Sequence, residues 1–244
     1  MIRYKYLLPV ILLFAFTSLK AQLNGTYTVG GSNPDYPDLQ SAAGSLQQNG
    51  ISGPVRFQVR PGVYNGFSVW PFTNATGQDT VSFEAENGIT SSVVIDDRVE
   101  LQCCERVRLH KLTITANTST DQSSVFLYYT NHCLLSYCNI TNPTGENYDD
   151  DEALVKVLVP WDGALKRLSF DSCIISSPLK AIFMSGKQAA VHFSNSILTG
   201  QFEKTTYIKV YYNFCTLNFY DLYIYVGNQY YTGNNIHIPD TSGQ

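Results

Sequence analysis

Charged residues are scarce in this sequence, and basic residues are not in excess. Asp, Glu, Lys and Arg make up 15% of the 244 residues, against roughly 25% in an ordinary globular domain. The formal net charge is −4. A nucleic-acid-binding protein needs a basic surface that displaces counterions from phosphates. We therefore expect no nucleic-acid partner.

The sequence also lacks an apolar run long enough to cross a membrane as a helix. Residues 7–16 form an apolar run of about ten residues, whereas a bilayer core of about 30 Å requires about 20. The run follows Arg3 and Lys5, and small residues lead to Ala21, which is typical of a secretory signal peptide over residues 1–21. We expect a secreted or cell-surface protein with no membrane span in the mature chain.

No two cysteines have the C-x-x-C spacing of a zinc site. Six cysteines are present, at positions 103, 104, 133, 138, 173 and 215. They could form disulfides in an oxidising compartment, or they could be small buried hydrophobic residues. The repeat described next favours buried thiols, with a Cys138–Cys173 bridge as the alternative.

A short apolar pattern recurs along the chain. Two apolar residues separated by one position lie on the same face of a β-strand. Seven such pairs occur, with successive steps of 26, 26, 26, 35, 23 and 26 residues: Val55/Phe57, Val81/Phe83, Val107/Leu109, Cys133/Leu135, Leu168/Phe170, Val191/Phe193 and Leu217/Phe219. From the third pair onward, small or apolar residues also recur three and five positions after each pair.

This period predicts one coil of a parallel β-helix. A propeller blade needs about 40 residues for its four strands, which is too long. Equivalent residues of successive coils stack at about 4.8 Å. The sequence therefore predicts an all-β fold, a single-stranded right-handed parallel β-helix of about seven coils. Cys138 and Cys173 then fall in one inward column, and Cys133 takes an apolar position.

The ends of such a rod expose strand edges that need a cover. Residues 38–48 place four apolar residues at helical spacing: Leu39, Ala42, Ala43 and Leu46. Asp38 is suited to cap this helix. We expect a capping helix within residues 22–54, followed by the β-helix over residues 55–244. Toward the C-terminus no cover is found, so we expect a partner or a further chain at that end.

Residues 23–66 resemble the N-terminal segment of secreted bacterial pectin-lyase-like β-helix proteins. Those proteins often begin with a GTYTVGG-type run, a Y-x-x-[LI]-Q-x-A helix, a G-P-V strand and a P-G-x-Y turn. The matching residues here are 25–31, 36–42, 53–55 and 61–64. The resemblance implies the β-helix fold. It implies activity poorly, because the scaffold carries lyases, esterases, hydrolases and non-catalytic surface proteins.

The signatures of three enzyme classes on this fold are missing. The D-F-I-F-G and L-G-R-P-W segments of pectin methylesterases do not occur. The R-x-P-x-x-R segment of pectate lyases and the N-T-D and G-D-D segments of polygalacturonase-type hydrolases are also absent. Residues 93–97 (VVIDD) only partly match the W-I-D-H-type strand of pectate lyases. The resemblance therefore argues against these named activities.

If the paired residues point inward, their neighbours form outward columns along the rod. The columns contain Gln58, Glu84, His110, Ser136 and Asp171 in one, Arg106, His132 and Arg167 in a second, and Arg108 and His192 in a third. A lyase needs a base, and a cation beside the uronate carboxylate. Arg106, Arg108 and His110 are therefore candidate catalytic residues. Glu84 and His132 are candidate ligand contacts, although the exterior of a soluble rod is polar in any case.

The 35-residue coil carries an acidic insertion over residues 145–152. Asp149, Asp150, Asp151 and Glu152 offer hard oxygen ligands that could bind calcium. The alternative is a solvated acidic loop, since consecutive carboxylates do not readily converge on one ion. No other cofactor is expected.

Tyrosine is concentrated near the C-terminus, where residues 207–231 hold eight of the 17 tyrosines. Aliphatic residues alternate with tyrosine over residues 222–226, so Tyr223 and Tyr225 are expected to face away from the core, as is Tyr220. Exposed aromatic rings could stack on sugar rings or contact a partner. The alternative is that they are ordinary half-buried strand residues.

Three functional hypotheses follow. The first is a non-catalytic secreted or cell-surface β-helix that binds glycan or another surface component, through the tyrosines and the polar strip. The second is a polysaccharide lyase or related carbohydrate-active enzyme that acts on a uronate-containing polysaccharide. The third is a structural module, or the N-terminal part of a longer surface protein.

Overall fold

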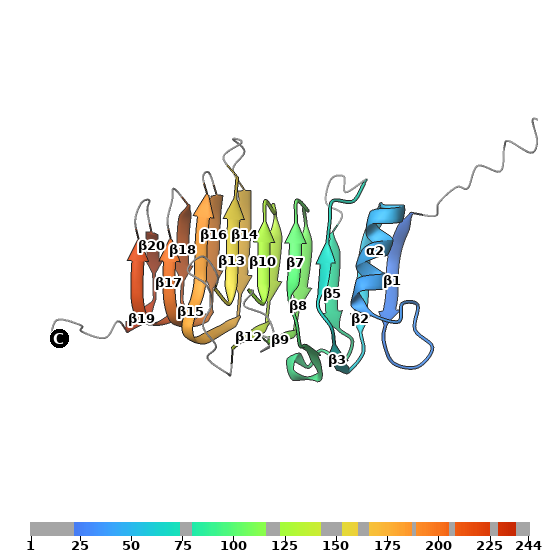
Figure 1. Cartoon of the computed structure of the whole chain (residues 1–244), viewed down its shortest axis with the longest axis horizontal. Coiled ribbons are helices and arrows are strands. Elements are labelled where there is room, and N and C mark those ends of the chain that lie inside the picture. The colour runs from blue at the N-terminus through green and yellow to red at the C-terminus, as the bar shows by residue number, and fades with distance from the viewer. Residues whose placement is uncertain are drawn as a thin grey trace, which may run out of the picture.

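The computed structural model describes residues 22–73, 80–115, 123–142, 153–160, 166–186, 189–204, 208–224 and 229–237. In these residues the chain winds into a rod of parallel strands, with an α-helix at the N-terminal end (Figure 1). Among them, no helix has the length and apolar character needed to cross a bilayer. The predicted all-β right-handed parallel β-helix is confirmed.

One side of the rod is a nine-stranded sheet, here called sheet A, in which all strand pairs are parallel. Its strands, in spatial order, are β1 (Leu23–Val29), β2 (Ile51–Val59), β5 (Val81–Ala85), β8 (Val107–His110), β11 (Cys133–Ser136), β14 (Lys166–Asp171), β16 (Ala189–Ser194), β18 (Lys209–Asn213) and β20 (Gln229–Thr232). Each coil contributes one of these strands, so chain order and spatial order coincide.

The remaining strands form sheet B, to which each coil contributes two short strands up to β13 and a single strand from β15 onward. Its strands are β3 (Gly62–Tyr64), β4 (Phe67–Val69), β6 (Val93–Ile95), β7 (Val99–Gln102), β9 (Thr113–Thr115), β10 (Val125–Tyr128), β12 (Asn139–Thr141), β13 (Val155–Val159), β15 (Ile174–Gly186), β17 (Ile197–Lys204), β19 (Thr216–Ile224) and β21 (Asn235–His237). The long strand β15 pairs with both β12 and β13, which joins the two series into one sheet. A short 3₁₀ turn, η2 (Thr90–Ser92), precedes β6.

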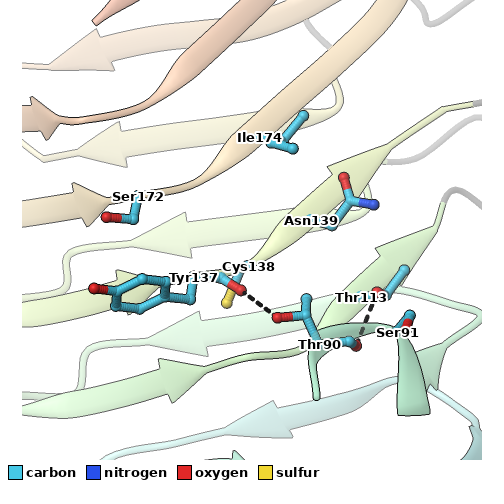
Figure 2. A pocket seen from close by; sticks show the side chains of 8 residues that line it. All are labelled: Thr90, Ser91, Thr113, Tyr137, Cys138, Asn139, Ser172 and Ile174. Atoms are coloured by element: carbon cyan, nitrogen blue, oxygen red, sulfur yellow. Dashed lines mark hydrogen bonds between the residues drawn. The ribbon is translucent and has the colours of Figure 1, made fainter. Parts of the chain in front are cut away.

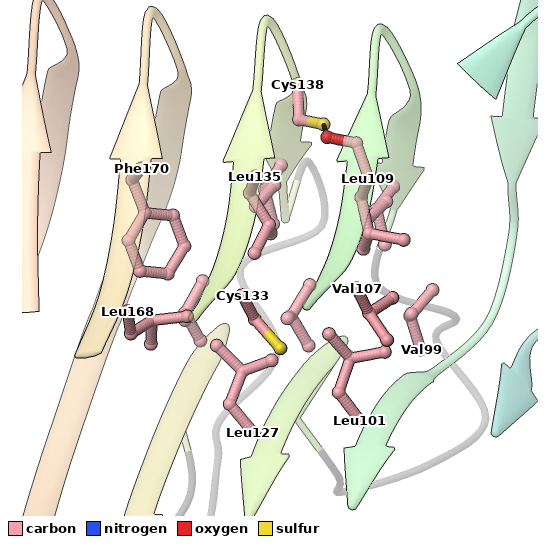
Figure 3. Close-up of a cluster of buried hydrophobic side chains, with 14 of the residues drawn as sticks. Val99, Leu101, Val107, Leu109, Leu127, Cys133, Leu135, Cys138, Leu168 and Phe170 are labelled. Atoms are coloured by element: carbon pink, nitrogen blue, oxygen red, sulfur yellow. Dashed lines mark hydrogen bonds between the residues drawn. The ribbon is translucent and has the colours of Figure 1, made fainter. Parts of the chain in front are cut away.

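The core lies inside the coil, between the inward faces of the two sheets. Figure 3 shows inward side chains of both sheets, among them Leu109 and Leu135 of sheet A and Leu101 and Leu127 of sheet B. Six of the seven predicted pairs, from Val55/Phe57 to Val191/Phe193, occupy matching inward positions of sheet A and are buried. The two-residue spacing therefore identified the core.

The seventh predicted pair, Leu217/Phe219, is wrong as a rung of sheet A. It belongs to β19 of sheet B, where Leu217 lies beside Leu198. The rung of sheet A at this level is Val210 and Tyr212, in register with Val191 and Phe193. The coil from Val191 to Val210 is only 19 residues long, and a buried tyrosine replaces the expected aliphatic or phenylalanine.

The corner from sheet A to the next strand of sheet B is a tight turn with a left-handed residue. Successive coils place the following residues there, with φ between 51° and 61°: Lys111, Tyr137, Ser172, Asn195, Phe214 and Gly233. At the turns from Lys111 to Phe214, the amide of the left-handed residue donates to a carbonyl of the next coil; the Tyr137 N–H, for example, donates to the Asp171 carbonyl at 2.9 Å. This conformation suits glycine and asparagine best. The other residue types at these turns adopt it because the surrounding coil structure requires it.

The N-terminal cover is the predicted helix. Helix α2 (Leu39–Asn49) begins after Asp38, whose carboxylate accepts the Ser41 N–H at 2.7 Å. Its buried face includes Leu39 and Leu46, and it contacts β1, β2 and β4. Among the described residues at the other end, β20 pairs with β18 and β21 with β19. The expected partner at that end stays a prediction.

All six cysteines are thiols in this structure. Five are buried, as predicted, but Cys103 is exposed, because it occupies a left-handed turn position with φ of 49° after β7. The Cys138 thiol donates to the Leu109 carbonyl at 3.6 Å and the Cys173 thiol to the Leu135 carbonyl at 3.4 Å. The same inward column continues to Cys215, three residues after Tyr212.

Candidate functional site

Strand register places the predicted outward columns as expected. Glu84, His110 and Ser136 lie side by side on β5, β8 and β11. Arg108 lies beside Ser82 and Leu134 in the neighbouring column. The side chains of one column are about 4.8 Å apart at the backbone, so Glu84, His110 and Arg108 share one surface of sheet A.

The carboxylate of Glu84 is held by the preceding coil. Its Oε1 pairs with the Arg56 Nε at 3.2 Å, and its Oε2 accepts the Ser82 hydroxyl at 3.4 Å. No ion pair between Glu84 and His110 occurs among the described residues, in which the Glu84 carboxylate pairs with Arg56. Glu86, at the end of this strand, pairs with Arg60 at 3.6 Å. Both acids are therefore already neutralised by arginines.

A buried serine fixes Arg108 and His110. The Ser136 side chain is 2% exposed. Its Oγ accepts from the Arg108 Nε at 3.3 Å and lies 2.8 Å from the His110 Nδ1. The Arg108 Nη2 also contacts this Nδ1, at 3.2 Å. Sequence reasoning placed Ser136 in the column but gave it no role.

The contacts of the His110 Nδ1 suit the tautomer with the proton on Nε2. A guanidinium can only donate hydrogen bonds, so in this tautomer the Nδ1 accepts from the Arg108 Nη2 and from the Ser136 hydroxyl. Burial lowers the pKa of His110, the charge of Arg108 lowers it further, and Glu84 raises it in part.

A hollow of about 340 Å³ lies over these side chains. It is lined by Arg56, Glu84, Ala85, Glu86, Gly88, Arg108, His110 and Lys111. Gly88 has φ of 70°, and a Cβ there would come within 3.3 Å of the Lys111 Nζ. Among the described residues, neither Arg108 nor Lys111 has a carboxylate within ion-pairing distance. The hollow therefore presents two uncompensated cations and the His110 imidazole.

Two other predicted strip residues lie elsewhere. Arg106 and His132 occupy left-handed turn positions, with φ of 59° and 53°, just before β8 and β11. Neither lines the hollow, and the His132 side chain is exposed. Arg106 and His132 hold equivalent turn positions on successive coils, and neither contributes to the hollow beside Arg108 and His110.

The remaining predicted site residues are placed in part. Tyr220 is 46% exposed, on β19 of sheet B, away from the outer face of sheet A. The side chain of Tyr223, all of Tyr225, and the acidic residues Asp149, Asp150, Asp151 and Glu152 lie outside the described residues. No cluster of three His, Cys, Asp or Glu side chains occurs in the described part of the chain, so the calcium site stays a prediction.

An aromatic column near the C-terminal end was not predicted. On the outer face of sheet A, the His192 and Tyr211 rings are 4.4 Å apart and the Tyr211 and Tyr230 rings 4.7 Å apart. The interplanar angles are 5° and 10°. Because these rings cover one another's faces, mainly their edges are left for a ligand. The 19-residue step would have revealed this column.

A second polar cluster, also not predicted, lies on sheet B around Glu100. Its carboxylate pairs with the Arg98 Nε at 2.7 Å and accepts from Gln102 at 2.8 Å and Ser68 at 3.0 Å. The Arg98 guanidinium also lies 4.6 Å from the Phe126 ring centre. Because the carboxylate is occupied by three partners, this cluster fits a structural role.

A second hollow, of about 350 Å³, lies at the corner between the two sheets (Figure 2). It is lined by Thr90, Ser91, Thr113, Tyr137, Cys138, Asn139, Ser172 and Ile174. The Tyr137 ring meets the His110 ring edge-on, with 5.6 Å between centres. The two hollows therefore meet at this pair of rings.

Comparisons with known proteins identify the fold. No family model matches the sequence, and no curated protein matches it. Among solved structures, the pectin methylesterase from Aspergillus niger is similar, with a TM-score of 0.52 over 91% of this chain and 88% of that chain. The sequences are 11% identical. The likeness shows a shared right-handed parallel β-helix, as the N-terminal resemblance implied.

Two histidines on sheet A predict how stability depends on pH. Burial lowers the pKa of both His110 and His192 below 6.5, so the unfolded chain binds more protons than the native protein as pH falls through about 6.5. The free energy of unfolding should therefore fall between about pH 7 and pH 5. In urea titrations, His110→Gln should flatten this dependence. Equal pH slopes in the wild-type and His110→Gln proteins would contradict the assignment.

Proposed function

We propose that this protein is a secreted or cell-surface β-helix that binds an acidic, uronate-containing polysaccharide at the hollow on sheet A. The single observation that carries the proposal is the arrangement of Arg108, His110 and Ser136. Ser136 contacts both the Arg108 and the His110 side chain. The groups that they leave free to contact a ligand are hydrogen-bond donors. Lys111 adds a second cation beside them. A ligand for this surface must offer negatively charged acceptors, which uronate carboxylates do.

The same arrangement favours binding over catalysis. A lyase base must accept a proton, and in the tautomer with its proton on Nε2 the His110 Nδ1 already accepts from Arg108 and Ser136. Glu84 and Glu86 are engaged by arginines. The Ser136 hydroxyl is buried beneath the hollow, so it has no access to a substrate. None of these groups is a free base in this conformation.

The second candidate is a carbohydrate-active enzyme on the same scaffold. Its support is the similarity in fold to a protein described as a pectin methylesterase, together with the placement of Arg108 and His110 in one hollow. A uronate-release assay on pectin and alginate, with and without calcium, tests for a lyase. Product formation that is lost in Arg108→Ala would establish a lyase, and a flat result on both substrates would exclude one.

The binding proposal predicts that Arg108→Ala weakens binding of polygalacturonate by about tenfold. The substitution removes one of the two uncompensated cations and releases the His110 ring. Lys209→Ala is the matched control, because Lys209 is exposed on sheet A but does not line the hollow. Isothermal titration of both variants measures the difference. Equal losses in both would indicate non-specific attraction of a polyanion and contradict a defined site.

A further inference from the structure

The hollow at the corner has a composition unlike that of its neighbour. Five of the eight residues around the sheet A hollow are charged, whereas none of the eight around the corner hollow is. The corner hollow has about the same volume, 350 Å³. An ionised ligand group would meet no opposite charge among the lining residues of the corner hollow. The two hollows therefore favour different ligand groups, charged in the sheet A hollow and uncharged at the corner.

The corner hollow combines apolar surface with small hydrogen-bonding groups. The Tyr137 side chain is 50% exposed and Ile174 is 43% exposed. Around them lie the hydroxyls of Ser91 and Ser172 and the amide of Asn139 (Figure 2). A pyranose ring has apolar C–H faces and a rim of hydroxyls, which match an aromatic or aliphatic wall with a few placed polar groups.

Tyr137 connects this hollow to the sheet A site. Its ring packs edge-on against His110, and its carbonyl accepts the Thr90 hydroxyl at 3.0 Å. The Thr90 carbonyl in turn accepts the Thr113 hydroxyl at 3.0 Å. Hydrogen bonds therefore connect Thr90, which lines the corner hollow, to the two following coils. A polysaccharide lying over His110 therefore reaches a fixed, uncharged hollow directly beyond it.

We infer that the corner hollow holds a neutral sugar residue next to the uronate bound on sheet A. The ligand is then an acidic heteropolysaccharide, in which neutral sugars accompany uronates, rather than a polymer of uronate alone. This inference rests on the proposed function, since it assigns the substrate class of the same extended site. Arg108, His110 and Lys111 bind the uronate, and Tyr137 and Ile174 contact the neutral sugar.

The test compares two polymers by isothermal titration. One is polygalacturonate, and the other is a rhamnogalacturonan backbone, in which uronate and a neutral deoxyhexose alternate. The wild-type chain should bind the alternating polymer about tenfold more tightly. Tyr137→Asn and Ile174→Thr should each remove most of this preference, and Ile174→Thr should leave the affinity for polygalacturonate within about twofold.

The chain supplies a matched control for each variant. Phe214 has the same left-handed turn position as Tyr137, with φ of 54° in both, and is 67% exposed. Ile197 lies beside Ile174 in the strand register and is 42% exposed. Neither lines the hollow. Phe214→Asn and Ile197→Thr should therefore keep the preference. Asparagine is tolerated at this turn, as Asn195 shows, so folding should survive.

The outcomes separate the two proposals. If neither polymer binds, the proposed function fails and the inference with it. If polygalacturonate binds but the alternating polymer binds no more tightly, the inference alone is overturned. A preference that survives both Tyr137→Asn and Ile174→Thr also overturns it, because the neutral sugar would then lie elsewhere.

Discussion

Phe193→Ala is expected to lower the free energy of unfolding by about 3–5 kcal/mol. Phe193 is fully buried, and its ring lies 4.8 Å from that of Phe170 and 5.5 Å from that of Tyr212, at interplanar angles of 14° and 11°. Removing it leaves a cavity in the middle of a continuous stack. The surrounding coils are joined by parallel strands on both sides, so they have little freedom to close the space.

The effect should be uneven along the rod. In a repeat protein each unit contacts mainly its neighbours, so Phe193→Ala should loosen β18 and β20 more than β2 and β5. Hydrogen exchange measures this directly, and urea denaturation gives the total loss. Phe214→Ala, at a 67% exposed position one coil further on, should change the stability by less than about 0.5 kcal/mol. A loss below about 1 kcal/mol for Phe193→Ala would contradict a continuous core.

The same aromatic column shows how far the sequence predicts the fold. Pairs at two-residue spacing identified six rungs, because burial on one strand face forces that spacing. The column ends in Tyr212 and Tyr231, whose rings stack at 5.0 Å. Tyrosine is not an obvious core residue, and this coil is short, so the pattern was matched to Leu217 in the other sheet. The capping helix was predicted because Asp38 and the helical spacing are local signals.

The sequence predicts which residues of the candidate site share an outward column, but it does not predict the contacts between their side chains. Register follows from the repeat, which brought Glu84, Arg108 and His110 together. The contacts between side chains do not follow from it. Arg56 from another coil takes the Glu84 carboxylate, and Ser136 fixes both Arg108 and His110. The positive φ at Arg106 and His132, neither of which contributes to the hollow, has no residue-type signal, because both are ordinary side chains in a glycine-like conformation.

Lys204→Met is expected to raise the free energy of unfolding by about 1–3 kcal/mol. Lys204 is fully buried, and among the described residues its Nζ has no hydrogen-bond partner. Its neighbours in the strand register are Met184 and Ile224, so a methionine would continue an apolar column of similar volume. Burial lowers the pKa of this lysine below 10.5. At neutral pH the native state therefore bears the cost of either burying the charge or releasing the proton.

The pH dependence distinguishes this effect from better packing alone. Between the lowered pKa and 10.5 the unfolded chain binds more protons than the native protein, so wild-type stability should rise with pH across that interval. Lys204→Met should lack this rise, and its advantage should shrink as pH approaches about 10. Lys209→Met, at an exposed lysine of sheet A, serves as the control and should change little at any pH. Urea denaturation from about pH 7 to pH 10 measures all three proteins. An advantage of Lys204→Met that is constant with pH would mean that the amine is not desolvated in the native state.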